Sequence, residues 1–143
     1  MTVFSIRSEP VDEPFIDTGP WYASVVPDDP RHIDVMTWLR KSNCSHVTTD
    51  YVVDETLTLL RARGERSRAV ALGRHLMDLA GVTIHFISEV EIRQAWAMFR
   101  DNPNRDWSFT DCTSKVVIEN LHIKQVLTFD RHFAESGTVT IIP

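Results

Sequence analysis

Residues 46–63 read HVTTDYVVDETLTLLRAR, and this stretch predicts the class of the fold. Its first four residues are rich in β-branched side chains and form a short run typical of a β-strand. After them, Val53, Leu57 and Leu60 recur at the spacing of one face of an α-helix. A strand that runs directly into a helix is the first half of a βαβ unit, so the stretch indicates an α/β fold with parallel strands.

The same alternation of strand and helix continues on both sides of this stretch. We expect strands at 15–17, 46–49, 82–87, 125–129 and 138–142. We expect helices at 21–26, 30–41, 50–63, 67–79, 89–100 and 109–121. Parallel strands joined by helical crossovers predict a three-layer α/β/α sandwich around a central, mainly parallel sheet.

Two of these helices carry apolar residues that we expect to face the core. In the helix 30–41, which Asp29 would cap, they are Ile33, Met36, Trp38 and Leu39. In the helix 89–100 they are Val90, Ala95, Trp96 and Phe99.

The length and composition are those of one globular domain. A chain of 143 residues buries its own core, and we interpret 1–11 as an N-terminal extension and 12–143 as the domain. No apolar run approaches the roughly 20 residues of a membrane-spanning helix, and the N-terminus lacks the apolar segment of a secretory signal. Cys44 and Cys112 fit no zinc-binding spacing. We therefore expect a cytoplasmic protein with free thiols and no membrane contact.

The charge of the chain is unevenly distributed. Its formal net charge of −5 counts against nucleic-acid binding, although a site built from carboxylates is acidic by construction and a bound cation reverses its local sign. One basic stretch contains Arg61, Arg63, Arg66, Arg68 and Arg74, opposed there only by Glu65. Two interpretations stay open: a solvated helix face, or a surface that contacts RNA phosphates or a protein partner.

Four acidic residues are predicted to meet at one rim of the sheet. Asp17 and Asp130 each follow a strand, Glu55 lies in the second turn of the helix after 46–49, and Asp111 lies in the first turn of the helix before the fourth strand. In open parallel sheets, ligands bind beyond the carboxyl ends of the strands. Clustered carboxylates repel each other unless cations neutralise them, and oxygen ligands favour Mg²⁺ or Mn²⁺. Such ions would activate a water for phosphodiester hydrolysis.

Each acid also has a purely structural interpretation. Asp17 would cap the next helix, and Glu55 would be a solvated helix residue. Asp111 would complete a capping box with Ser108, and Asp130 would begin a turn. The residue pattern alone leaves these alternatives open.

Four local sequences resemble the acidic motifs of PIN-domain ribonucleases, in order, spacing and chain length. They are FIDTG at 15–19, TTDYVVDETL at 48–57, DWSFTDC at 106–112 and VLTFDRHF at 126–133. The last two are specific, and the resemblance covers about 12–143. There are two departures: about a dozen residues precede the first strand, and Gly19 stands where a serine is common in the family.

The resemblance implies a PIN-like fold and Mg²⁺- or Mn²⁺-dependent RNA cleavage, often as the toxin of a VapBC toxin–antitoxin pair that a small antitoxin blocks. It makes Asp17, Glu55, Asp111 and Asp130 the acidic quartet. Asp106 and Thr110 would be additional site residues, and Ser108 a weaker helper. A homodimer is also implied, for which Trp38 and Trp96 are candidate contacts if they do not belong to the core.

Other functions fit the sequence less well. Asp17-Thr18-Gly19 matches the triplet of aspartic proteases, but the helical spacing along the chain contradicts their β-rich fold. A phosphatase with an aspartyl nucleophile would have a second aspartate at Gly19. A catalytically inactive PIN-like module that binds a protein or RNA partner is the alternative from a different class, and RNA turnover would distinguish it.

Overall fold

The protein is built on one parallel sheet. The computed structural model describes residues 13–78, 81–137 and 140–142. Its strands are β1 (Phe15–Ile16), β2 (His46–Thr49), β3 (Val82–His85), β4 (Gln125–Leu127) and β5 (Thr140–Ile142). They lie in the order β3-β2-β1-β4-β5, and all neighbouring pairs are parallel. The predicted fold class is confirmed.

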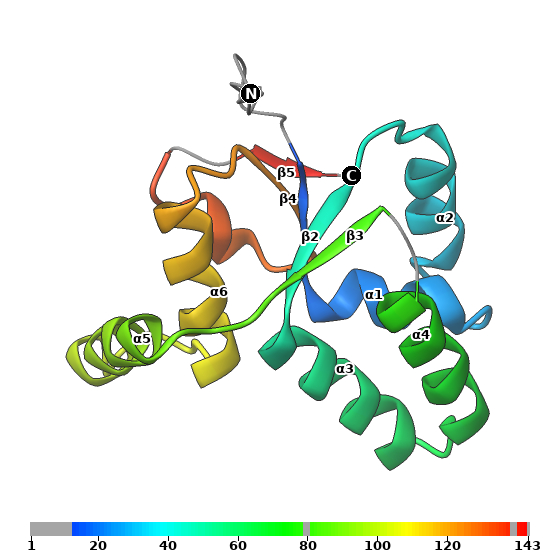
Figure 1. The fold of residues 1–143 in the computed structure, drawn as a ribbon, viewed down its shortest axis with the longest axis horizontal. Coiled ribbons are helices and arrows are strands. Elements are labelled where there is room, and N and C mark those ends of the chain that lie inside the picture. Colours follow the sequence, from blue (N-terminus) through cyan, green and yellow to red (C-terminus); the bar gives the residue numbers. More distant parts are fainter. Residues whose placement is uncertain (1–12, 79–80, 138–139, 143) are drawn as a thin grey trace, which may run out of the picture.

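Helices cover both sides of the sheet. The helices are α1 (Thr18–Val25), α2 (His32–Lys41), α3 (Asp50–Ala62), α4 (Arg66–Asp78), α5 (Glu89–Asp101) and α6 (Phe109–Asn120), with a 3₁₀ helix η1 (Arg131–Ala134). Figure 1 shows α1, α2 and α4 on one side and α5 and α6 on the other, while α3 runs away from the end of β2. No helix in the described ranges is long and apolar enough to cross a bilayer.

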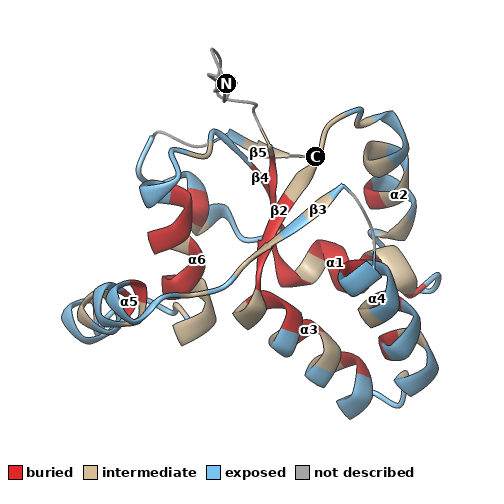
Figure 2. Cartoon of the chain, viewed as in Figure 1, coloured by how far each residue is buried: buried red, intermediate tan, exposed pale blue. Residues whose placement is uncertain are grey.

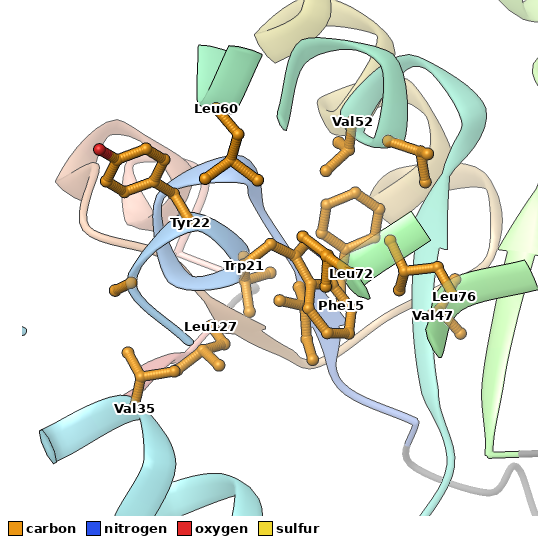
Figure 3. Packing of buried hydrophobic residues seen from close by; sticks show 14 of the residues in the cluster. Phe15, Trp21, Tyr22, Val35, Val47, Val52, Leu60, Leu72, Leu76 and Leu127 are labelled. Atoms are coloured by element: carbon orange, nitrogen blue, oxygen red, sulfur yellow. The ribbon is translucent and has the colours of Figure 1, made fainter. Parts of the chain in front are cut away.

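The core is centred on β1, which has a strand on each side. Phe15 pairs with Val47 of β2 and with Val126 of β4, and its side chain is fully buried. Figure 3 shows Phe15 among Trp21, Val52 and other apolar side chains of the main core. Because β1 is fixed on both edges, the position of the residue that follows it is fixed as well.

Several predicted boundaries were wrong by a few residues. Helix α1 begins at Thr18, before Pro20, because a residue without an N–H is tolerated throughout the first turn. Helix α2 begins at His32, and Asp29 accepts from the backbone N–H of Arg31 without capping the helix. Strand β4 ends at Leu127, where the next residue turns its side chain to the candidate site. The N-terminal extension and part of the predicted 138–142 strand lie outside the described residues.

The predicted core faces of two helices were partly wrong. In α2 the buried residue is Val35, whereas Ile33 is 76% exposed. In α5 only Ala95 of the predicted set is buried, and Val90, Trp96 and Phe99 are exposed. Helix α5 lies at the margin of the molecule, packs chiefly on α6, and is coloured mainly as exposed in Figure 2. One neighbouring helix covers only a narrow stripe, so the other apolar residues stay on the surface.

Candidate active site

Asp17 is the most buried acid of the predicted quartet. It directly follows β1, and its backbone N–H donates to the carbonyl of Leu127 at 3.0 Å. The residue is 4% exposed and stands at the N-cap position of α1, but its side chain does not cap the helix. Its Oδ2 accepts a hydrogen bond from the hydroxyl of Thr128 at 2.8 Å. The carboxylate is therefore held at the end of two adjacent strands.

The environment of Asp17 disfavours its negative charge. Burial raises the pKa of Asp17 from 3.8 to about 7, although hydrogen bonds from the Thr18 backbone and the Thr128 hydroxyl lower it. The negative charges of Asp111 and Asp130 raise the pKa further. Three of the four predicted acids therefore lie close enough to repel each other, and a cation between them would relieve this repulsion.

Asp111 is held by the start of α6. Its backbone N–H donates to Ser108 Oγ at 3.0 Å, and its Oδ2 accepts from the backbone N–H of Ser108 at 3.0 Å. This is the capping box that the sequence predicts. The box occupies Oδ2 and fixes the carboxylate, while Oδ1 has no hydrogen-bond partner in the described chain. The structural role of Asp111 is therefore compatible with a role as a ligand.

Asp130 lies opposite Asp111 and is exposed. Its backbone N–H donates to Thr128 Oγ1 at 3.1 Å, whereas its carboxylate caps nothing in η1. The hydroxyl of Thr128 thus connects Asp17 and Asp130. Thr128 did not appear among the predicted site residues, although its place directly after β4 was a usable signal.

The structure does not bring Glu55 into the same close group. Glu55 is half-buried on α3 and forms no hydrogen bond or ion pair with any described residue, and Asp54 beside it is exposed. It does not appear among the charges that affect Asp17. Helix α3 packs against α6, so Glu55 stays on the same side of the sheet edge as Asp111. A bridging water would be needed to connect it to the other acids.

Of the two additional site residues, Asp106 lines the cavity beside Asp111 and Thr110 does not. Asp106 is exposed and lines a cavity of about 380 Å³ together with Asp111, Asp130 and other residues of the same rim. Thr110 is half-buried in the first turn of α6, where its carbonyl accepts from the hydroxyl of Thr113 at 2.7 Å. Asp106 therefore faces the candidate site, whereas no described contact ties Thr110 to the acids.

His132 is a site residue that the sequence analysis missed. Its Nε2 lies 3.5 Å from Asp111 Oδ2, and ligand atoms of Asp111, Asp130 and His132 lie within 4.8 Å of one another. The sequence showed His132 only as part of a turn after Asp130. Its proximity to Asp111 depends on the 3₁₀ geometry of η1, which the residue pattern does not reveal.

The basic stretch is divided between three environments, and Arg74 shares that of Arg61 and Arg66. Arg68 forms an ion pair with Glu65 at 2.8 Å, and the guanidinium of Arg63 lies 4.9 Å from the ring centre of Tyr22. Arg61 and Arg66 line a cavity of about 500 Å³ between α3 and α4. This cavity shares no lining residue with the one beside Asp111.

The acids fit a divalent cation. Asp17, Asp111 and Asp130 offer carboxylate oxygens, and none of them is paired with a lysine or arginine of the described chain. Lys115 lies near Asp111 but forms no ion pair with it, so the carboxylates keep oxygen atoms of the kind that Mg²⁺ and Mn²⁺ prefer. The site can therefore hold a cation that neutralises it and binds a phosphate.

Comparisons with known proteins agree with this geometry, although no protein-family model matches the chain. The sequence is similar to the 23S rRNA-specific endonuclease VapC20 of Mycobacterium tuberculosis, with 31% identity over 130 residues, 90% of this chain and 98% of the relative. The fold is similar to the crystal structure of Mycobacterium tuberculosis VapC20, described as a sarcin-ricin loop cleaving toxin, with a TM-score of 0.82, 28% identity and coverage of 90% and 98%.

A second solved structure has a more distant likeness. FitAcB from Neisseria gonorrhoeae matches with a TM-score of 0.64 and 16% identity, over 90% of this chain and 96% of that one. At this identity the likeness concerns the fold alone.

Proposed function

The chain belongs to the VapC-like PIN-domain ribonucleases, and from this premise we propose that it is a Mg²⁺- or Mn²⁺-dependent endoribonuclease, the toxin of a cytoplasmic VapBC toxin–antitoxin pair. The observation that carries the metal dependence is Asp17. Its carboxyl group is buried beside Asp111 and Asp130 and has no cationic side chain as a partner among the residues that the structure describes. A buried carboxylate without a counter-ion is energetically costly, so a bound cation would stabilise the charged form of Asp17.

The residues of the site would divide the work between them. Asp17 and Asp111 would hold the cation directly, and Asp130 and Glu55 would complete the site partly through water. Asp106, which lines the cavity, would be an additional site residue, and Thr110 would be a second one. When bound, Mg²⁺ or Mn²⁺ would supply Lewis acidity toward the scissile phosphate and activate a water. The Ser108 cap and the Thr128 hydroxyl would keep the carboxylates oriented.

The substrate would be RNA, and the relative suggests where to look first. Because VapC20 is named for cleavage of 23S rRNA, we propose ribosomal RNA as the first substrate to test. A single-stranded loop offers splayed bases and an accessible backbone, which suits a shallow cavity beside an acidic site.

The experiment is cleavage of ribosomal RNA with and without metal. We expect endonucleolytic products with a 5′-phosphate and a 3′-hydroxyl, loss of cleavage in EDTA, and recovery with Mn²⁺. Asp17→Asn and Asp111→Asn should abolish cleavage without unfolding the protein, whereas Asp54→Asn, which changes an exposed neighbour of Glu55, should leave it intact. Cleavage in EDTA, or products with a 2′,3′-cyclic phosphate, would contradict the proposal. RNA binding without turnover would favour the inactive binding module.

The cavity between α3 and α4 suits the antitoxin better than RNA. Arg61 and Arg66 lie at a groove that also contains Leu57, Val70 and Met77, and Met77 is 62% exposed. Apolar side chains with arginines beside them fit an amphipathic acidic segment, whereas phosphates need only charge. Replacing Arg61 and Arg66 with glutamine should weaken antitoxin binding and its salt dependence while RNA cleavage is retained. An equal loss of antitoxin binding and of RNA cleavage would contradict the assignment of this groove to the antitoxin.

We also propose that the toxin is a homodimer that pairs through α5. Trp96 is 53% exposed, and Val90 and Phe99 are exposed on the same helix. Trp38, the other predicted contact, packs against the core and lies 5.4 Å from the ring of His46. Trp96 is therefore the better candidate for an interface.

A further inference from the structure

We infer that His132 supplies a nitrogen ligand to the cation held between Asp111 and Asp130. The inference rests on the proposed metal-dependent function and adds to it a residue outside the acidic quartet. A nitrogen ligand would change the chemistry of the ligand set and, as a result, which metal the site prefers.

The ligand atoms of Asp111, Asp130 and His132 lie close to the positions that ligands of one ion take. One ligand atom each of Asp111, Asp130 and His132 lies within 4.8 Å of the others. Ligands on one ion with bonds of about 2.1 Å lie at most roughly 4.2 Å apart. Small side-chain rotations would bring the three atoms onto one ion. The residues line the same cavity, so the ion would have access from solvent.

The ring of His132 faces the carboxylates with one nitrogen and the interior with the other. Nδ1 is buried and has no hydrogen-bond partner. Nε2 faces Asp111 Oδ2 at 3.5 Å, which is longer than the 2.7 to about 3.2 Å of an N–H···O hydrogen bond. Nε2 therefore has only this long contact with Asp111 and would gain from a stronger partner on the carboxylate side. A cation between the carboxylates would be that partner.

The surrounding residues hold the imidazole in this position. Lys115 Nζ donates to the backbone carbonyl of His132 at 3.0 Å and lies 4.7 Å from the ring centre of Phe133. Phe133 is buried, and its ring lies 4.5 Å from that of His132. The ring centre of Trp107 lies 6.1 Å from that of His132. The backbone and ring of His132 are therefore fixed before a metal binds, as a ligand requires.

A nitrogen ligand changes the metal preference of the site. Carboxylates alone suit Mg²⁺, whereas imidazole favours transition metals along the first row. A set of two carboxylates and one imidazole should therefore bind Mn²⁺ in preference to Mg²⁺. Removing the imidazole should lower Mn²⁺ affinity by at least the roughly 10- to 100-fold that loss of an outer-shell partner costs, with a smaller effect on Mg²⁺.

The test is pulsed electron paramagnetic resonance of the protein titrated with Mn²⁺ alone. We expect modulation from a directly coordinated ¹⁴N nucleus in the wild type, which changes when histidine is labelled with ¹⁵N. The signal should disappear in His132→Phe, which keeps a ring but no nitrogen, and persist in the control His75→Phe, where an exposed histidine of α4 is replaced. The labelled wild type reports whether a histidine coordinates the metal, and His132→Phe, checked for folding by circular dichroism, identifies which one.

The outcomes separate this inference from the proposed function. Mn²⁺ bound without nitrogen coupling would overturn the role of His132 while leaving the metal-dependent nuclease intact. Nitrogen coupling that survives in His132→Phe would also overturn it, because another histidine would then be the ligand. Absence of Mn²⁺ binding in the wild type, together with RNA cleavage in EDTA, would overturn both.

Discussion

At the scale of single residues, the site depends on one neutral hydroxyl as much as on its acids. Thr128 Oγ1 donates to Asp17 Oδ2 and accepts from the N–H of Asp130. One side chain thus holds the carboxylate of Asp17 and the backbone of Asp130, two residues from opposite ends of the chain. The hydroxyl adds no charge, so it orients the acids without neutralising them. The remaining repulsion is available to stabilise a bound cation.

This repulsion predicts an unusual pH dependence of stability in the absence of metal. The pKa of Asp17 is about 7 in the folded protein against 3.8 normally, so between these values the unfolded chain releases a proton that the folded chain keeps. The wild type should therefore lose up to roughly 4 kcal/mol as pH rises from 4 to 7, and no more above 7. Asp17→Asn lacks this loss. Urea unfolding in EDTA should show the variant gaining stability over the wild type with pH, and a constant difference would contradict the assignment.

The glycine at position 19, where a serine is common in the family, has a structural reason. A Cβ at Gly19 would lie 2.8 Å from Cδ2 of Phe129, whose ring also carries the guanidinium of Arg31 at 4.2 Å. The ring of Phe129 thus occupies the space that a serine side chain would need.

Substitution of Gly19 should therefore be costly. We expect Gly19→Ala to lower the free energy of unfolding by about 1–3 kcal/mol, because the ring must move. Gly73→Ala is the matched control: its Cβ would meet Leu57 at an ordinary 3.7 Å, and loss of a helical glycine should stabilise by about 0.5–1 kcal/mol. Thermal unfolding measures both, and equal signs would contradict this account.

At the scale of elements, two helices begin in the same way with different consequences. Ser88 caps α5 and Ser108 caps α6, each in a complete capping box. The partner in α5 is Glu91, which also bonds His85 at 2.9 Å, and the partner in α6 is Asp111. The same capping box therefore supports an ion pair in one helix and a proposed metal ligand in the other.

The two caps give a matched pair of substitutions. Ser88→Ala and Ser108→Ala should each lower stability by about 0.5–2 kcal/mol through the lost cap. Only Ser108→Ala should weaken Mn²⁺ binding, because the lost Oγ accepts from the backbone N–H of Asp111 and so holds the first turn of α6 that positions its carboxylate. Chemical denaturation and calorimetric titration measure the two effects separately. A similar loss of Mn²⁺ affinity in Ser88→Ala would mean that the effect is one of general stability.

The elements also show what the sequence could predict. The positions of strands and helices could be predicted because the apolar spacing that marks them, as in β2 and α3, involves only residues that are close in the sequence. The capping role of Asp111 was local for the same reason. The exposure of Trp96 and the position of His132 depend on which element lies opposite each of them. Glu55 was predicted from its place in the second turn of a helix, which does not determine how far its side chain lies from the other acids. Such properties arise from tertiary packing and leave no periodic signal.

At the scale of the whole molecule, the three candidate binding surfaces are separated from one another. The acids lie at the carboxyl edge of the sheet, the groove with Arg61 and Arg66 lies between α3 and α4, and α5 presents its apolar side chains at the margin. A net charge of −5 makes nonspecific RNA binding weak, so productive binding would rely on the cation. These separate surfaces would let RNA, an antitoxin and a second subunit bind at different places.

The dimer can be tested without disturbing the site. Trp96 lies 6.3 Å from Phe99 in a stacked pair on the exposed face of α5, so a charge at Trp96 would be buried without a partner in a symmetric interface. We expect Trp96→Glu to sediment as a monomer of 16.4 kDa where the wild type sediments as a dimer. Ile33→Glu is the control, because Ile33 is 76% exposed on α2, away from α5, and its replacement should leave the dimer intact. A wild type that stays monomeric at high concentration, or dissociation by Ile33→Glu instead of Trp96→Glu, would remove α5 as the interface.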